Sequence, residues 1–215
     1  MSKPLHYRIF HGNTVPLISL SGAALLILVS DRLAHAIVVT GALVWVYCLS
    51  SLAAYFGVRI FPRQGRTVLL TFLTSFIAGL YLLLLWMLSP LCALEVFLVI
   101  SIIPLFCMGS GIFPRLETLS LETTVFAAFS EAMILGALLV IFALIREPLG
   151  YLSLSLPGGS QGMILLFSFT TESFLPIHLI TSSCGALLLL GYFLGLYRYL
   201  KAQYTLQEES DKDEY

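Results

Sequence analysis

The sequence predicts an all-α integral membrane protein with six transmembrane helices, built as two inverted three-helix repeats whose first and fourth spans are broken. Hydrophobic residues make up 59% of the chain and charged residues only 11%, whereas about a quarter of the residues in a soluble domain are charged. Several apolar stretches are long enough to cross a bilayer. Two of them carry prolines and glycines, which interrupt a regular helix.

The apolar stretches are separated by short polar turns. We expect spans at residues 15–30, 33–60, 67–88, 91–112, 125–145 and 175–197, in one membrane domain of residues 1–200 with an acidic cytoplasmic tail at 201–215. The fifth span is expected to end at Arg146 and Glu147, because Pro148 disfavours a continuing helix. The apolar run Met163–Phe167 is too short to cross, so we expect it at the interface or as a re-entrant segment.

Two interrupted spans occupy matching places in the two halves. The first contains Pro16 and Gly22, and the fourth contains Pro104, Gly109 and Gly111. Backbone groups that lose their helical partners in a bilayer must be satisfied by protein or by water in a cavity. Paired interrupted segments are typical of inverted repeats that hold a site between them.

The distribution of lysine and arginine predicts the orientation. With a cytoplasmic N-terminus, only Arg32 and Arg146 lie outside. The inside segments hold Lys3, Arg8, Arg59, Arg63, Arg66, Arg115, Arg198, Lys201 and Lys212. This positive-inside bias places both termini in the cytoplasm. No basic patch with interleaved aromatic residues is present, so the sequence gives no support for nucleic-acid binding.

Few polar residues are candidates for chemistry inside the membrane. Glu131, within the fifth span, could bind or relay a cation, or could instead reach back to the headgroups as an interfacial carboxylate. Asn13 could cap the first span or line a pathway. Arg146 is explained by the helix dipole alone, as a cation in a last turn. The cysteines lack metal spacing and are expected to be buried thiols.

Several short motifs follow one another in a defined order. They are Asn13, Leu17 and Gly22 in the first span, Ile103-Pro-Leu105 and Arg115-x-Glu117 in and after the fourth, Phe129-Ser130 and Leu144-x-Arg-Glu147 in the fifth, and Gly150-Tyr-Leu-Ser-Leu154 beyond it. In this order and spacing the chain resembles the small six-helix membrane subunits of the Rnf electron-transport complex and the sodium-pumping NADH:quinone reductase (NQR). Within that family it is most similar to the E-type chain of Rnf and the D-type chain of NQR, over about Asn13 to Tyr199.

The resemblance implies a partner and a cofactor. In that family two paralogous subunits of inverted topology face each other in the bacterial inner membrane, and their broken half-helices share a [2Fe–2S] cluster held by cysteines from the first and fourth spans. Here Ala24 and Ser110 stand at those ligand positions. Alanine cannot ligate iron and serine is a poor substitute for thiolate. Cys107, one helical turn before Ser110, is the remaining candidate metal ligand in this part of the chain.

Two classes of function follow. The first is a membrane subunit of an Rnf/NQR-type complex, which couples ferredoxin or NADH oxidation to Na⁺ or H⁺ translocation. In that case Asn13, Gly22, Pro104, Gly109, Ser110 and Gly111 would line a path with Glu131 as its polar stop. The alternative is a cluster-free paralogue that acts as a small transporter or as a structural subunit.

Overall fold

The computed structural model describes residues 20–60, 65–109, 120–158, 162–168, 178–196 and 199. Its elements are α2 (Leu20–Val29), α3 (Leu33–Ile60), α4 (Arg66–Leu88), α5 (Pro90–Gly109), α6 (Leu121–Tyr151), β1 (Ser153–Pro157), β2 (Met163–Ser168), α7 (His178–Thr181) and a further helix, Ser183–Leu196. Within these ranges four helices are long and apolar enough to cross a membrane: Leu33–Gly57, Arg66–Leu88, Pro90–Met108 and Leu121–Tyr151. The expectation of a membrane protein is confirmed to this extent.

The structure describes only part of the other two expected spans, 15–30 and 175–197. Among the described residues, α2 has ten residues, and α7 is separated at Ser182 from the helix Ser183–Leu196. About 20 residues are needed to cross a bilayer perpendicular to its plane. The six-span count and the inverted repeats therefore remain predictions.

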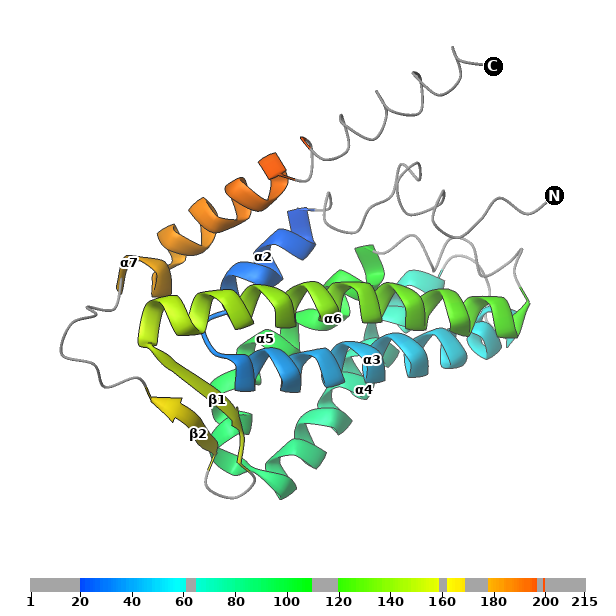
Figure 1. Cartoon of the computed structure of the whole chain (residues 1–215). Coiled ribbons are helices and arrows are strands. Elements are labelled where there is room, and N and C mark those ends of the chain that lie inside the picture. Colours follow the sequence, from blue (N-terminus) through cyan, green and yellow to red (C-terminus); the bar gives the residue numbers. More distant parts are fainter. Residues whose placement is uncertain are drawn as a thin grey trace, which may run out of the picture.

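Helix α3 is the centre of the bundle (Figure 1). It runs antiparallel to α6, with which it makes its most extensive contact, since Leu33 meets Glu147 at one end and Thr40 meets Gly136 farther along. It runs parallel to α5, because His35 meets Glu95 at the same end. Helix α4 packs antiparallel to both and exposes large apolar side chains such as Phe72 and Leu83 outward. Such a surface fits a lipid environment.

The α3–α6 contact is close because small residues line it. Ala128, Ala132 and Ala143 of α6 are fully buried. A Cβ atom at Gly136 would collide with the Cγ2 atom of Thr40. Small residues let two membrane helices approach closely and gain dispersion energy along their length.

A β-hairpin closes one end of the bundle, so the all-α prediction is wrong at this point. Strands β1 and β2 pair antiparallel, with an irregularity between Leu154 and Ser155. The apolar run Met163–Phe167 lies within β2. Figure 1 shows the hairpin beside the end of α6. Alternating serine and leucine in Ser153–Pro157 is the period of a half-buried strand, which accounts for the pairing.

Prolines do not end helices where the sequence suggested. Helix α5 runs through Pro104 to Gly109, and α6 runs through Pro148 to Tyr151. Each proline removes only one backbone hydrogen bond, and neighbouring helices can hold a membrane helix straight around it. Helix α6 ends at Leu152, whose φ of 52° is left-handed. The expected break at Pro104 and the expected helix end before Pro148 are therefore wrong.

The other expected break points have different outcomes. Gly22 lies inside α2 and Gly109 is the last residue of α5. Asn13, Ser110 and Gly111 lie outside the described residues. The break at these last positions stays a prediction.

Candidate functional site

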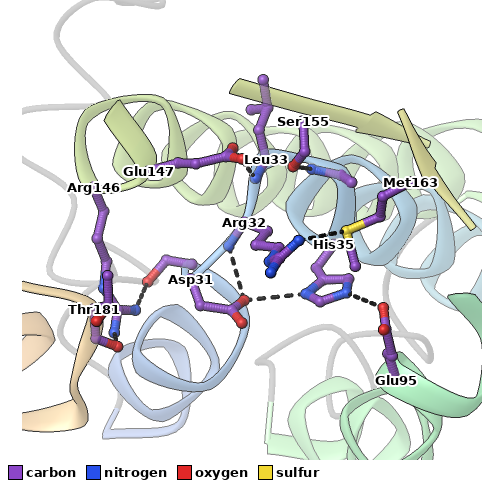
Figure 2. Close-up of polar contacts among 12 residues, drawn as sticks. Asp31, Arg32, Leu33, His35, Glu95, Arg146, Glu147, Ser155, Met163 and Thr181 are labelled. Carbon is purple, nitrogen blue, oxygen red and sulfur yellow. Dashed lines mark hydrogen bonds and ion pairs between the residues drawn. The ribbon is translucent and has the colours of Figure 1, made fainter. Parts of the chain in front are cut away.

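Arg146 lies near the end of α6 and is 1% exposed. All its donor groups are used, and Figure 2 shows Arg146 beside Thr181, one of its partners. The Nε group donates to the carbonyl oxygen of Ile180 at 2.7 Å, Nη1 donates to Ser30 Oγ at 2.7 Å and Ile27 O at 3.3 Å, and Nη2 donates to Thr181 O at 2.6 Å and Ser182 O at 3.0 Å. A guanidinium has five N–H groups. The side chain is therefore fully satisfied without water.

The acceptors of Arg146 belong to the carboxyl ends of two helices. Ile27 and Ser30 lie in and after the last turn of α2, and Ile180 to Ser182 close α7. The last carbonyl groups of a helix have no intrahelical donor and form the negative pole of its dipole. One buried cation thus satisfies two helix ends that would otherwise have to bind water.

The next residue, Glu147, binds a helix end of opposite polarity. It is 1% exposed, and its Oε2 accepts a hydrogen bond from the backbone N–H of Leu33 at 2.7 Å. Leu33 is the first residue of α3, where the free N–H groups form the positive pole. Consecutive residues of α6 therefore hold the ends of three other helices, and we call Arg146 and Glu147 the helix clamp.

Two residues, Ser182 and Gly185, allow the short connection between α7 and the helix Ser183–Leu196. Ser182 Oγ accepts from the backbone N–H of Gly185 at 3.3 Å, as an N-cap residue does. A Cβ atom at Gly185 would collide with the carbonyl oxygen of Leu179, so glycine is needed there. One helix end is capped by Ser182 and the other by Arg146. The backbone is thereby satisfied on both sides of this break.

A second polar group lies beside the helix clamp and joins the α2–α3 turn to α5. His35 Nδ1 lies 3.1 Å from Asp31 Oδ1, and His35 Nε2 lies 2.8 Å from Glu95 Oε2 (Figure 2). Asp31 Oδ1 also accepts from the backbone N–H of Arg32 at 2.8 Å. Burial raises the pKa of Asp31, but the hydrogen bonds from His35 and Arg32 and the positive charge of Arg146 bring that pKa below its ordinary value.

The β-hairpin contacts the residues next to these polar groups, Arg32 and Ala34. Ser155 Oγ lies 3.5 Å from the backbone nitrogen of Ala34, in the first turn of α3. The guanidinium of Arg32 lies 5.3 Å from the ring centre of Tyr151, and its Nη1 lies 3.5 Å from the sulfur of Met163. A cation over an aromatic face is attracted by the ring quadrupole. The hairpin is thus tied to the start of α3 by Ser155 and to the α2–α3 turn by Met163.

Glu131, the predicted polar stop of an ion path, lies elsewhere. It is half-buried on α6, fifteen residues and therefore about 22 Å along the axis from Arg146. Its charge acts on Tyr47 and Cys107, so the three residues lie in one region of the bundle. Cys107 is 1% exposed, with its sulfur 3.4 Å from Ser50 Oγ. The structure does not bring Glu131 to the helix clamp.

The residues present do not fit a [2Fe–2S] cluster of the kind the resemblance implies. Such a cluster is held by thiolates, with histidine as the known substitute. Ala24, in α2, offers no ligand atom, and Ser110 lies outside the described residues. Cys107 is enclosed between α3 and α5 beside Ser50.

Sequence reasoning found part of the polar site. It singled out Arg146 and Glu147, which the structure places together with three helix ends. It assigned no role to Asp31 or His35, although an aspartate four residues before a histidine at the start of an apolar helix is a readable signal for a pair. The bond from His35 to Glu95 joins residues 60 positions apart. Only the packing of α3 on α5 shows it.

No family model matches the chain, and no curated protein sequence matches it. The resemblance to the Rnf and NQR subunits therefore depends on the order and spacing of the short motifs alone.

Proposed function

We propose that this chain is a membrane subunit of an Rnf/NQR-type electron-transport complex in the bacterial inner membrane, with both termini in the cytoplasm. It has a structural role in the membrane part of the complex and contributes residues to the path of Na⁺ or H⁺. Electrons pass through partner subunits in this proposal. The paralogous subunit of inverted topology is its expected neighbour.

The helix clamp is the observation that carries this proposal. Arg146 and Glu147 belong to the motif on which the resemblance chiefly depends, and the resemblance implies short half-helices that meet inside the membrane. In the structure Arg146 joins the carboxyl ends of α2 and α7, and Glu147 joins the start of α3. The motif therefore has a physical task that this architecture requires.

The absence of ligand atoms at a cluster position supports a subunit without its own electron carrier. Ala24 has no group that binds iron. Cys107 lies beside Ser50 in the interior of the bundle and is 1% exposed. No step of the proposed role passes through a cluster.

Glu131 is the candidate ion-binding residue of the path. A carboxylate in the middle of an apolar helix costs free energy unless it is paired or wetted, and such residues often mark ion pathways. Glu131 lies ten residues into α6, about 15 Å from its start. Ser50, Tyr47 and Cys107 provide the other polar atoms of this region.

The test is affinity purification of the tagged full chain from its native membranes in mild detergent. The proposal predicts stoichiometric recovery with a second small membrane subunit and with flavin- and iron–sulfur-carrying subunits. An Arg146→Met variant should lose these partners together with its fold, whereas an Arg32→Met variant should keep them. Recovery of the wild-type chain alone would contradict the proposal.

A second candidate function is a small independent transporter. The break at Ser182 favours it, because discontinuous helices commonly form the substrate sites of transporters. A chain that purifies alone and moves an ion or solute when reconstituted in liposomes would establish this function instead.

A further inference from the structure

His35 is bonded at both ring nitrogens to carboxylates from different elements. Asp31 belongs to the turn between α2 and α3, and Glu95 belongs to α5. The two nitrogen–oxygen distances are 3.1 and 2.8 Å. The side chain of His35 is 12% exposed, that of Asp31 is 37% exposed and that of Glu95 is 48% exposed. The bridge is thus enclosed at its centre and reachable by water at its ends.

Counting protons shows what this arrangement requires. A neutral imidazole has one N–H group and one lone pair, so it can donate to only one of two ionised carboxylates. The other contact would set a nitrogen lone pair against carboxylate oxygens. Two favourable contacts need one additional proton, on the ring or on a carboxyl group. The imidazolium form, with N–H groups toward Asp31 and Glu95, satisfies both at once.

Among the residues that the structure describes, no neighbouring charged group takes the place of the additional proton between His35 and the two carboxylates. From the α2–α3 turn Arg32 provides its backbone N–H to Asp31, while its guanidinium lies over Tyr151. On α6, the positive charge of Arg146 acts on Asp31, but its N–H groups all bind helix ends. Glu147, also on α6, accepts a hydrogen bond from the backbone N–H of Leu33. Beside Glu95 on α5 lies the thiol of Cys92, and the hairpin presents the uncharged Ser155 and Met163.

We propose that Asp31, His35 and Glu95 form a proton-binding site that latches the α2–α3 turn to α5. With the proton bound, His35 holds both carboxylates and the rim of the bundle is closed beneath the hairpin. When the pH rises, the proton leaves the site for the solvent. His35 then keeps one hydrogen bond, and the other carboxylate is released. Glu95 is the more exposed of the two, so its contact is the one that opens.

This inference is separate from the proposed ion path, which lies around Glu131. It needs neither partner subunits nor ion transport. The latch can therefore stand if the proposed function fails, and can fail if the proposed function stands.

The experiment is a pair of measurements on the full chain in detergent micelles between pH 5 and pH 9. Selective ¹⁵N-histidine labelling reports the protonation of His35, identified by the signal lost in H35Q. Thermal unfolding is followed in parallel. We expect both ring nitrogens of His35 to carry protons at neutral pH, and the midpoint of unfolding to fall by about 2–4 °C as His35 titrates, equivalent to about 1 kcal/mol.

The variants separate the latch from general effects of pH. E95Q, changed at an exposed position, should fold and should lose at least half of the fall in unfolding midpoint. E122Q, at an exposed position in the first turn of α6, removes a carboxylate far from His35 and should keep the whole fall. A His35 that is neutral at neutral pH would overturn the proposal, as would parallel pH profiles for the wild type and E95Q. If H35Q does not fold, the His35 signal is assigned instead as the one that remains when the other three histidines, His6, His11 and His178, are replaced by glutamine, so the ¹⁵N measurement still decides the matter.

Discussion

Glu147 Oε2 accepts a hydrogen bond from the backbone nitrogen of Leu33 at 2.7 Å, and this contact ties the end of α6 to the start of α3. The preceding side chain, Arg146, binds the carboxyl ends of α2 and α7. An anion at a helix N-terminus and a cation at helix C-termini are each favourable. The sequence Arg-Glu thus matches the polarity of three helix ends.

Arg146→Met should be among the most destabilising single substitutions in the chain. Each buried acceptor left without a donor costs about 1–3 kcal/mol, so the total loss should exceed about 3 kcal/mol. Thermal unfolding in detergent should show a midpoint lowered by about 6–12 °C. Arg32→Met is the control, since its half-buried side chain loses a cation–π contact worth about 0.5–1 kcal/mol. Equal effects of the two variants would show that Arg146 does not hold the helix ends.

Glu147→Gln should be mild, because the amide oxygen can still accept from Leu33 N–H and only the charge at the helix N-terminus is lost. The expected cost is about 0.3–1 kcal/mol. Glu147→Ala should cost more, since it also leaves the buried N–H group of Leu33 without a partner. The same unfolding assay measures both. If both variants cost the same, the hydrogen bond to Leu33 is unimportant.

Gly136→Ala should destabilise the α3–α6 contact by about 1–3 kcal/mol, because the added methyl group collides with Thr40. Gly79→Ala is the matched control in another membrane helix, since nothing lies within 4 Å of its added Cβ. That control should be neutral or slightly stabilising. The double variant Thr40→Ala/Gly136→Ala should recover part of the loss. A Gly136→Ala chain as stable as Gly79→Ala would contradict the close packing.

Acid should weaken the α2–α3 turn through Asp31. Because the pKa of Asp31 is lowered in the folded chain, its ionised form stabilises the fold above the ordinary value of 3.8. That stabilisation is lost as the pH falls through the lowered pKa. Asp31→Asn should therefore be less stable than wild type near neutral pH and should lose the part of the acid-induced decline that Asp31 causes. Parallel unfolding profiles from pH 6 down to pH 3 would refute this.

Glu131→Gln should reduce ion translocation by the reconstituted complex to a small fraction of the wild-type rate, because the amide cannot hold a cation or a proton in the way a carboxylate does. The chain should still assemble with its partners. Glu122→Gln, at an exposed position of the same helix, should translocate normally. Unchanged translocation in Glu131→Gln would remove Glu131 from the path and leave this chain a purely structural role.

The sequence predicted the long helices well because uninterrupted apolar residues have few other options in a bilayer. It failed at the ends, where tertiary contacts decide. Pro148 was expected to stop α6, yet the helix continues to Tyr151. The hairpin of Ser153–Pro157 and Met163–Ser168 was missed because its strands are too short to be distinguished from an interfacial segment.

In the candidate site, too, the sequence predicted the local features but not the tertiary contacts. Arg146 and Glu147 were identifiable as a pair at the end of an expected span, with a dipole explanation for Arg146. That explanation assigned Arg146 to its own helix, whereas its acceptors belong to α2 and α7. The partners of a side chain on another helix depend on packing, which no local pattern in one sequence specifies.

The most direct test of the central claim is metal and sulfide analysis, with EPR spectroscopy, of the complex that co-purifies with the tagged full chain. The wild type and Cys107→Ser should be compared at equal subunit recovery. The account predicts that partner subunits are present and that every iron–sulfur signal is identical in the two samples. A reducible [2Fe–2S] signal that disappears in Cys107→Ser would show that this chain holds a cluster and carries electrons, and would contradict the account.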